Sequence, residues 1–325
     1  MRNLSRREFI RLCGATGAAM SLADVLKPEI AEAFAGPASG KPPIVWLQGG
    51  SCSGCSISLL NSVSPEISEV LTGVISLKFH QTLMSAAGDQ AMDVLTQVKK
   101  KYSGEYVLVV EGTVPVGAGG MYATLGEQHE KPIPFVKWVK EMASGAKAVL
   151  AVGSCATFGG LPAGYPNPTD SQPLSKVISG VPLINIPGCP AHPDWVLGTI
   201  VHFLNYGIPE LDALHRPKMF FGSCVHDICG RRKDFDKGEF ATRLSGPGCL
   251  YKLGCKGPMA FADCPTRKFN NGTSWCVSAN SPCLACVEPV FPDQSGPFFT
   301  KIPEYGPAGT PSPQARKVKL MEGDK

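Results

Sequence analysis

The chain has 325 residues, of which 43% are hydrophobic and 18% are charged. This composition supports about two domains with substantial cores and excludes global disorder. The formal net charge of +4 is too small to indicate nucleic-acid binding, so we expect no nucleic-acid partner. No apolar run reaches the ~18 residues that a membrane-spanning helix requires, so we also expect no transmembrane anchor. The most informative number is the thirteen cysteines.

The N-terminal segment has the layout of an export signal. Arg6 and Arg7 form a pair, an uncharged stretch follows over 12–23, and an Ala-x-Ala site ends at Ala35. This order is typical of a twin-arginine signal peptide, here residues 1–35, which is removed on export. The sequence therefore predicts a periplasmic protein that folds before it crosses the membrane. The alternative is an amphipathic first helix with a chance arginine pair.

The first half of the chain alternates between strand and helix patterns. Short apolar runs predict strands at 44–50, 75–80, 106–112, 148–154 and 183–188, and helical spacing predicts helices near 91–102, 134–145 and 193–206. Apolar strands that alternate with helices indicate an α/β fold with a doubly wound parallel sheet of the flavodoxin-like kind. We assign this domain to residues 36–212.

The second half has no such pattern. After about residue 215 glycine, proline and cysteine dominate, and eight of the thirteen cysteines lie from Cys224 onward. A segment with so little regular structure must be held together by disulfides or by metal. We therefore predict an irregular, cysteine-rich domain over residues 213–325.

Four cysteines of the first half follow predicted strands. Cys52 and Cys55 follow the first strand, Cys155 the fourth and Cys189 the fifth. Because the carboxyl ends of parallel strands lie at one edge of the sheet, these thiols can meet at one point. The glycines beside them allow close backbone approach and leave amide N–H groups free to bond sulfur. The pattern predicts a metal site with four thiolate ligands.

The second half supplies enough ligands for further sites. Its candidates are His226, Cys229, Cys249, Cys255, Cys264, Cys276, Cys283 and Cys286. If Cys13 in the signal and the unpaired Cys224 are set aside, eleven cysteines and His226 make twelve ligands, or three sets of four.

Three chemistries remain open for these residues. Disulfides suit an exported chain, but Cys-x2-Cys pairs close only small loops and folding before export takes place in a reducing compartment. Structural zinc fits the spacing. Iron–sulfur clusters also take thiolates, sometimes with histidine, and they are favoured by the loops rich in glycine and proline. Iron–sulfur clusters in an exported protein would indicate electron transfer.

The chain resembles the small subunit of periplasmic nickel–iron hydrogenases. The matching segments are SRREFIR, CSGC, VEGTVP, VGSCATFGG, PGCPAHPDW, HDIC, CKGP, CP…FNNG and CLACVEP, which run in order over nearly the whole chain. The resemblance implies a heterodimer in which a large subunit holds the Ni–Fe centre and interconverts hydrogen with protons and electrons. This chain would hold no catalytic residue and would relay electrons to an external carrier such as a multihaem c-type cytochrome.

The resemblance also implies three ligand sets. The proximal set is Cys52, Cys55, Cys155 and Cys189; the medial set is Cys264, Cys276, Cys283 and Cys286; the distal set is His226, Cys229, Cys249 and Cys255. The commonest members have proline at the position of Cys276 and a medial 3Fe–4S cluster. A cysteine there predicts three 4Fe–4S clusters and resembles the nickel–iron–selenium branch, whereas the medial cluster would be 3Fe–4S if Cys276 were not a ligand.

Glu111 ends the third predicted strand. Taken alone it would be a surface carboxylate in a loop, and the resemblance implies a role at the subunit interface or in proton movement. Two rival functions remain. One is a complex-I-like iron–sulfur subunit, which would lack the cysteine-rich second half, and the other is an exported binding protein stapled by zinc or disulfides.

Overall fold

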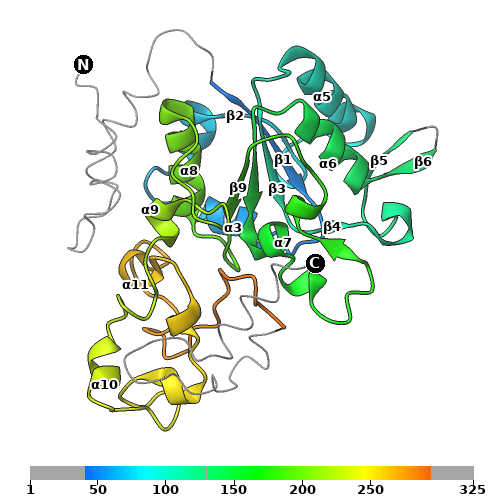
Figure 1. The fold of residues 1–325 in the computed structure, drawn as a ribbon. Helices are drawn as coiled ribbons and strands as arrows, with labels where there is room; N and C mark the ends of the chain where they lie inside the picture. The colour runs from blue at the N-terminus through cyan, green and yellow to red at the C-terminus, as the bar shows by residue number, and fades with distance from the viewer. Residues whose placement is uncertain (1–40, 129, 294–325) are drawn as a thin grey trace, which may run out of the picture.

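The computed structural model describes residues 41–128 and 130–293, so the predicted signal peptide lies outside the described residues. A parallel sheet of five strands forms the centre of the molecule (Figure 1). The strands are β1 (Pro43–Gln48), β2 (Ser76–His80), β3 (Val107–Glu111), β7 (Ala148–Val152) and β9 (Leu183–Ile186). These are the five strands predicted from the apolar runs.

The strand order β2-β1-β3-β7-β9 is that of a flavodoxin-like sheet, which confirms the predicted fold class. The register also aligns the carboxyl ends of neighbouring strands. Gln48 lies opposite Glu111, Glu111 opposite Val152, and Val152 opposite Ile186. The segments that follow β1, β3, β7 and β9 therefore begin side by side at one edge.

Helices cover both faces of the sheet. On one face lie α5 (Gly88–Lys101) and α6 (Phe135–Ser144), and on the other α3 (Gly54–Leu60) and α8 (Pro193–Tyr206) (Figure 1). Successive strand residues point to opposite faces. In β1, Val45 and Leu47 join one buried cluster, while Ile44 and Trp46 join the other.

Several short elements in the first half carry no sequence pattern long enough to predict them. They are α4 (Ile67–Glu69), the π-helical turn η1 (Val70–Val74), α7 (Gly153–Phe158), the hairpin of β5 (Thr124–Gln128) and β6 (Lys131–Pro134), the pair of β4 (Val114–Pro115) and β8 (Ser171–Gln172), and the 3-10 turns η2 (Gly117–Gly120), η3 (Leu161–Ala163) and η4 (Leu174–Lys176). Of these, α7 matters for the site because it carries Cys155.

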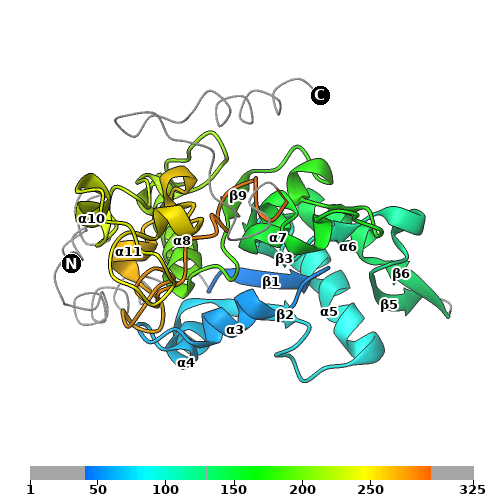
Figure 2. The same ribbon diagram turned by 90° about the horizontal axis from the view of Figure 1, so that it is seen from below.

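The second half is irregular, as predicted. Between residues 213 and 293 its regular elements are α9 (Lys218–Phe221), α10 (Arg232–Asp236), α11 (Cys264–Arg267) and the 3-10 turns η5 (Leu250–Leu253) and η6 (Gly257–Met259). This region lies beside α3 and α8 in both ribbon views (Figures 1 and 2).

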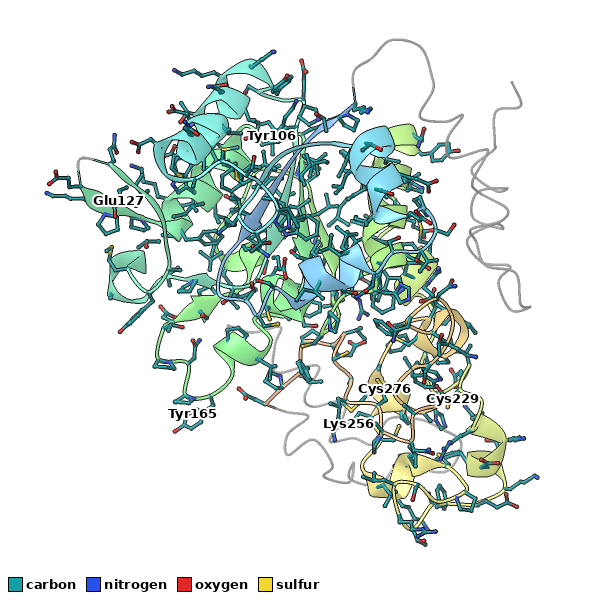
Figure 3. The ribbon with its side chains drawn as sticks, turned by 180° about the vertical axis from the view of Figure 1, so that it is seen from behind. Tyr106, Glu127, Tyr165, Cys229, Lys256 and Cys276 are labelled. Carbon is teal, nitrogen blue, oxygen red and sulfur yellow. The ribbon has the colours of Figure 1, made fainter. Side chains whose placement is uncertain are left out.

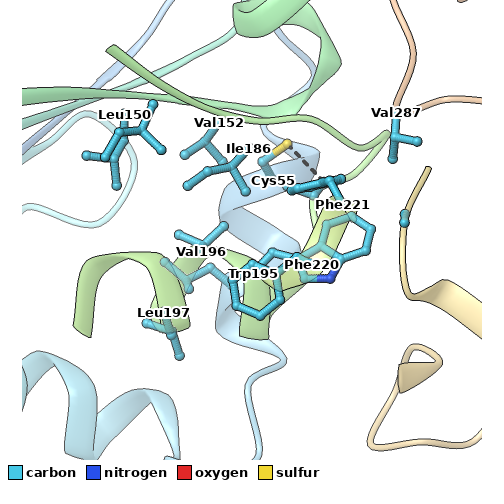
Figure 4. Close-up of a cluster of buried hydrophobic side chains, with 14 of the residues drawn as sticks. Cys55, Leu150, Val152, Ile186, Trp195, Val196, Leu197, Phe220, Phe221 and Val287 are labelled. Atoms are coloured by element: carbon cyan, nitrogen blue, oxygen red, sulfur yellow. Dashed lines mark hydrogen bonds between the residues drawn. The ribbon is translucent and has the colours of Figure 1, made fainter. Parts of the chain in front are cut away.

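The irregular region shares a hydrophobic core with the sheet layer. Trp195 of α8 packs against Phe221 with ring centroids 4.9 Å apart, and Val287 joins the same cluster (Figure 4). A half-buried ion pair between Arg267 and Asp194, 3.0 Å long, also joins the two parts. The boundary at residue 212 stays a prediction. Within the described residues, no helix combines the length and the apolar character needed to cross a bilayer.

Candidate metal centres

The proximal set gathers at the carboxyl edge of the sheet. Cys52 lies just before α3, Cys55 lies in its first turn, Cys155 lies in α7, and Cys189 follows β9. The pKa of Cys155 is raised to about 12, first by burial and then by the negative charges of Cys189 and Cys52. The pKa of Cys55 is also raised, chiefly by burial, with further contributions from Glu111, Cys155 and Cys189. The structure therefore brings all four thiols close together.

Glycines permit this approach. Gly153 has a φ of +86°, and a Cβ at this position would lie 2.5 Å from the Cys55 sulfur. At Gly54 a Cβ would lie 3.0 Å from the Cys52 sulfur. A backbone amide also reaches the site, because Ala191 N lies 3.5 Å from Cys55 Sγ. Glycine leaves room for the sulfurs because it has no Cβ, and a backbone N–H group can donate a hydrogen bond to a thiolate ligand.

Glu111 is buried, with 1% of its surface exposed, so the expectation of a surface carboxylate is wrong. Its Oε1 accepts the backbone N–H groups of Cys55 at 3.0 Å and of Ser56 at 3.2 Å. Its Oε2 accepts Trp46 Nε1 at 3.0 Å, Gln48 Nε2 at 3.2 Å and the Ser56 hydroxyl. The carboxylate thus satisfies two of the free N–H groups at the start of α3, which Ser53 as N-cap does not.

The network continues from Ser56 to His80, a residue that the sequence did not single out. Ser56 Oγ lies 3.1 Å from His80 Nε2, and His80 Nδ1 lies 3.2 Å from the hydroxyl of Thr82. Burial lowers the pKa of His80 to about 4, so the imidazole is neutral near pH 7. A polar residue that ends an apolar strand, as His80 and Glu111 both do, is the signal that would have revealed this network.

The distal set lies in the irregular region. His226 Nε2 is buried and has no hydrogen-bond partner among the residues that the structure describes. The ring contacts Phe235 edge-on, with centroids 4.5 Å apart. The pKa of Cys249 is raised to about 11, mainly by burial, and the charges of Cys255 and Cys229 raise it as well. A buried ring nitrogen without a partner is costly unless it binds something, so His226 fits a metal ligand.

In the medial set, Cys264, Cys283 and Cys286 are half-buried and Cys276 is exposed. The pKa of Cys264 is raised well above its usual value, first by burial and then by the charges of Cys286, Asp263 and Cys276. The pKa of Cys283 is raised by burial and by Cys255, Cys286 and Cys264. The charge of Cys276 acts on Cys264 and Cys286, and the charge of the distal cysteine Cys255 acts on Cys276.

The medial set contacts both of the others. On the distal side, Cys283 N donates to Cys255 Sγ at 3.3 Å. On the proximal side, the Cys286 thiol lies against the backbone N–H of Cys189, and the Ser154 hydroxyl, one residue before Cys155, donates to the carbonyl of Cys286. The three sets therefore follow one another in the order proximal, medial, distal.

The state and spacing of the thiols bear on the three competing chemistries. All twelve cysteines in the described part of the chain are free thiols, so none is paired there as a disulfide. In the same residues no three His, Cys, Asp or Glu side chains approach closely enough to hold a single metal ion. Cys224 stands outside the three sets, with its sulfur 3.6 Å from the carbonyl of Gly257.

Both halves of the chain are similar to known proteins. The family described as the C-terminal part of NiFe/NiFeSe hydrogenase small subunits matches residues 221–299, and the NADH ubiquinone oxidoreductase 20 Kd subunit family matches residues 52–203. The chain is 41% identical over 313 residues to the periplasmic [NiFeSe] hydrogenase small subunit of Desulfomicrobium baculatum, covering 91% of this chain and 99% of that protein. It is also 41% identical over 306 residues to the periplasmic [NiFe] hydrogenase small subunit 1 of Nitratidesulfovibrio vulgaris, covering 92% and 94%.

A solved structure has the same fold. The recombinant [NiFeSe] hydrogenase from Desulfovibrio vulgaris Hildenborough matches with a TM-score of 0.78 and 43% identity. The match covers 81% of this chain and 99% of that chain.

Proposed function

Because the chain belongs to the family of NiFe and NiFeSe hydrogenase small subunits, we propose that it conducts electrons between a hydrogen-activating centre in a large subunit and an external carrier. The observation that supports this role most strongly is the row of three ligand sets, in which the medial set contacts the other two. Bound iron–sulfur clusters would supply one-electron carriers there. The chain itself supplies the ligands, excludes water and donates hydrogen bonds to sulfur.

The residues are assigned to clusters as their grouping in the structure favours. The proximal ligands are Cys52, Cys55, Cys155 and Cys189; the medial ligands are Cys264, Cys276, Cys283 and Cys286; the distal ligands are His226, Cys229, Cys249 and Cys255. Each cluster is of the 4Fe–4S type. The medial assignment rests on Cys276, whose charge acts on both Cys264 and Cys286.

The large subunit packs over the proximal end of the row. Cys52 and Cys189 are exposed in this chain, whereas Cys55 is buried. In the segment that follows Cys55, Ile57 and Val63 leave 57% and 47% of their surfaces exposed. Exposed apolar side chains around exposed ligands are typical of a surface that a partner protein buries.

The protein works in the periplasm, after export by the twin-arginine route and removal of residues 1–35. Two of the relatives described above are named periplasmic, and the Arg6-Arg7 pair supports the export route. The external carrier is a multihaem c-type cytochrome, which receives electrons at the distal end. Residues 36–212 then form the proximal-cluster domain, and residues 213–325 form the domain of the other two clusters.

A complex-I-like subunit is the second candidate, since one matched family, the NADH ubiquinone oxidoreductase 20 Kd subunit, spans residues 52–203. That family covers only the part of the chain with the proximal set. The medial and distal ligands fall within the other matched range, 221–299, so the hydrogenase role accounts for more of the chain.

The relay role can be separated from hydrogen activation in the purified heterodimer. Cys249→Ala removes a distal ligand and should abolish hydrogen-dependent reduction of a cytochrome. Hydrogen–deuterium exchange needs only the centre in the large subunit, so it should persist. Cys224→Ala, which removes a thiol outside the three sets, should leave both activities unchanged. Full cytochrome reduction by the Cys249→Ala protein would contradict the proposal.

A further inference from the structure

Lys256 is a buried lysine at the contact between the medial and distal sets. Only 4% of the residue is exposed. It follows the distal ligand Cys255 directly in the chain, and its backbone N–H donates to the carbonyl of the medial ligand Cys283 at 2.7 Å. Cys283 N in turn donates to Cys255 Sγ at 3.3 Å. The side chain of Lys256 therefore starts from the place where the two sets touch through their backbones.

The ammonium group stays inside the protein. Its Nζ donates to the carbonyl of Gly254 at 3.2 Å, and Figure 3 shows Lys256 in the irregular region that also holds Cys229 and Cys276. A buried cation is costly unless negative charge lies nearby. The pKa of Lys256 is lowered on balance, first by burial, while the negative charges of Cys255 and Cys283 act in the opposite direction. Two of the charges that act on Lys256 thus belong to different ligand sets.

Arg231 is a second cation near the distal set, but unlike Lys256 it contacts the distal set alone. The charge of Arg231 acts on Cys229 and Cys255, which are both distal ligands. Its guanidinium donates to the carbonyl of Gly248 at 2.8 Å, and that residue precedes the distal ligand Cys249. The charge of Arg231 therefore acts on distal ligands, whereas the charge of Lys256 acts on one ligand of the distal set and one of the medial set.

We propose that the Lys256 ammonium is a fixed positive charge shared by the medial and distal clusters, and that it raises the reduction potentials of both. This inference rests on the proposed function, because it requires clusters in the two sets. A reduced cluster carries one more negative charge than an oxidised one, so a nearby cation stabilises the reduced form. The effect is larger in the interior than at the surface, where water and salt screen it.

A shared charge also has a consequence for the relay. Because it acts on neighbouring carriers in the same direction, it raises both potentials together and changes the difference between them little. The last transfer within the chain keeps its driving force, while both carriers become better acceptors for electrons that arrive from the proximal end.

The test is a redox titration of the purified heterodimer, followed by electron paramagnetic resonance. Lys256→Met removes the charge and keeps an unbranched side chain. The medial and distal midpoint potentials should both become more negative, while the proximal potential stays as in the wild type. Lys256→Arg should restore both potentials. Lys252→Met is the matched control, because it removes the same charge from an exposed position in the same segment and should shift none of the three.

Iron and sulfide analysis of each protein makes every outcome informative. Full cluster content in Lys256→Met with unchanged potentials would overturn the proposal. Loss of iron in both Lys256→Met and Lys256→Arg would also overturn it, because the residue would then act through packing. Loss of iron in Lys256→Met alone would support a requirement for the charge. A wild-type heterodimer without iron would instead refute the proposed function.

Discussion

At the scale of single residues, Cys276 decides the type of the medial cluster. Cys276→Pro should convert the medial cluster from 4Fe–4S to 3Fe–4S, since three cysteines would remain as ligands. Iron analysis should show a loss of about one iron per heterodimer, and electron paramagnetic resonance of the oxidised protein should show a new 3Fe–4S signal. Cys224→Ser is the control and should change neither. An unaltered spectrum in Cys276→Pro would show that Cys276 is not a ligand.

Substitution of Glu111 should lower the stability of the protein. Glu111→Gln puts an amide where five donors now converge on a carboxylate. Leaving buried donors unsatisfied should lower stability by at least ~2 kcal/mol, which corresponds to a fall in Tm of about 4 °C or more. Thermal unfolding of the heterodimer measures this.

Glu141→Gln is the control for Glu111. Glu141 forms an exposed ion pair with Lys99 at 3.1 Å, and such pairs contribute little to stability. Equal Tm values for the two variants would contradict the role of Glu111 as the acceptor that organises the start of α3.

The sequence reveals ligands more readily than the residues that support them. Strand-end spacing points to Cys52, Cys55, Cys155 and Cys189, because each lies next to a predicted strand. The burial of Glu111 could not be predicted, since its donors come from segments 55 to 65 residues away in the chain. Only the register that aligns β1 with β3 brings them together.

At the scale of elements, one polar network joins three strands and a helix. Trp46 lies in β1, His80 in β2, Glu111 in β3 and Ser56 in α3. His80 stacks on Trp46 with centroids 5.4 Å apart. The network holds the start of α3, and hence Cys55, against the carboxyl edge of the sheet.

This network predicts a pH dependence. The pKa of His80 falls from 6.5 to about 4 on folding because the ring is buried. The unfolded chain therefore binds a proton first, and stability that is fully present above pH 6.5 is lost as the pH falls towards 4. The loss amounts to roughly 3 kcal/mol. Tm measured against pH should fall more steeply for the wild type than for His80→Gln over this range, and parallel curves would contradict the prediction.

The length of an element explains which ones the sequence predicts. The five strands are continuous apolar runs, and α5 and α8 are each 14 residues long, so their patterns are clear. In contrast, α3 and α7 have seven and six residues and begin at glycines within cysteine motifs. The hairpin β5–β6 is largely exposed and shows no alternation of apolar and polar residues. Such short elements are stabilised by contacts with the rest of the fold and not by a pattern in their own sequence.

At the scale of the whole molecule, the irregular region depends on contacts from outside itself. It shares its core with α8 and is tied by the ion pair between Arg267 and Asp194. We expect the chain expressed without a large subunit to be poorly soluble or deficient in clusters, since the proximal ligands Cys52 and Cys189 and exposed apolar side chains such as that of Ile57 would stay uncovered. Iron content and size-exclusion chromatography measure this. A stable monomer with all three clusters would contradict an obligate partner.

The number of ligand sets can be read from the sequence, but their order along a path cannot. Twelve candidate ligands make three sets of four by count, and the resemblance to hydrogenase small subunits implies which residues form each set. That the medial set lies between the others follows from contacts such as Cys283 with Cys255, 28 residues apart, and Ser154 with Cys286, 132 residues apart. A region without periodic structure gives no register from which such contacts could be predicted.

The most direct test of the central claim is the metal content of the purified heterodimer, measured together with acid-labile sulfide. The proposed ligand sets predict about twelve iron and twelve sulfide per small subunit in addition to the iron of the large subunit, with paramagnetic signals from three 4Fe–4S clusters on reduction. A colourless protein that contains zinc, or one whose cysteines are joined as disulfides, would contradict the account.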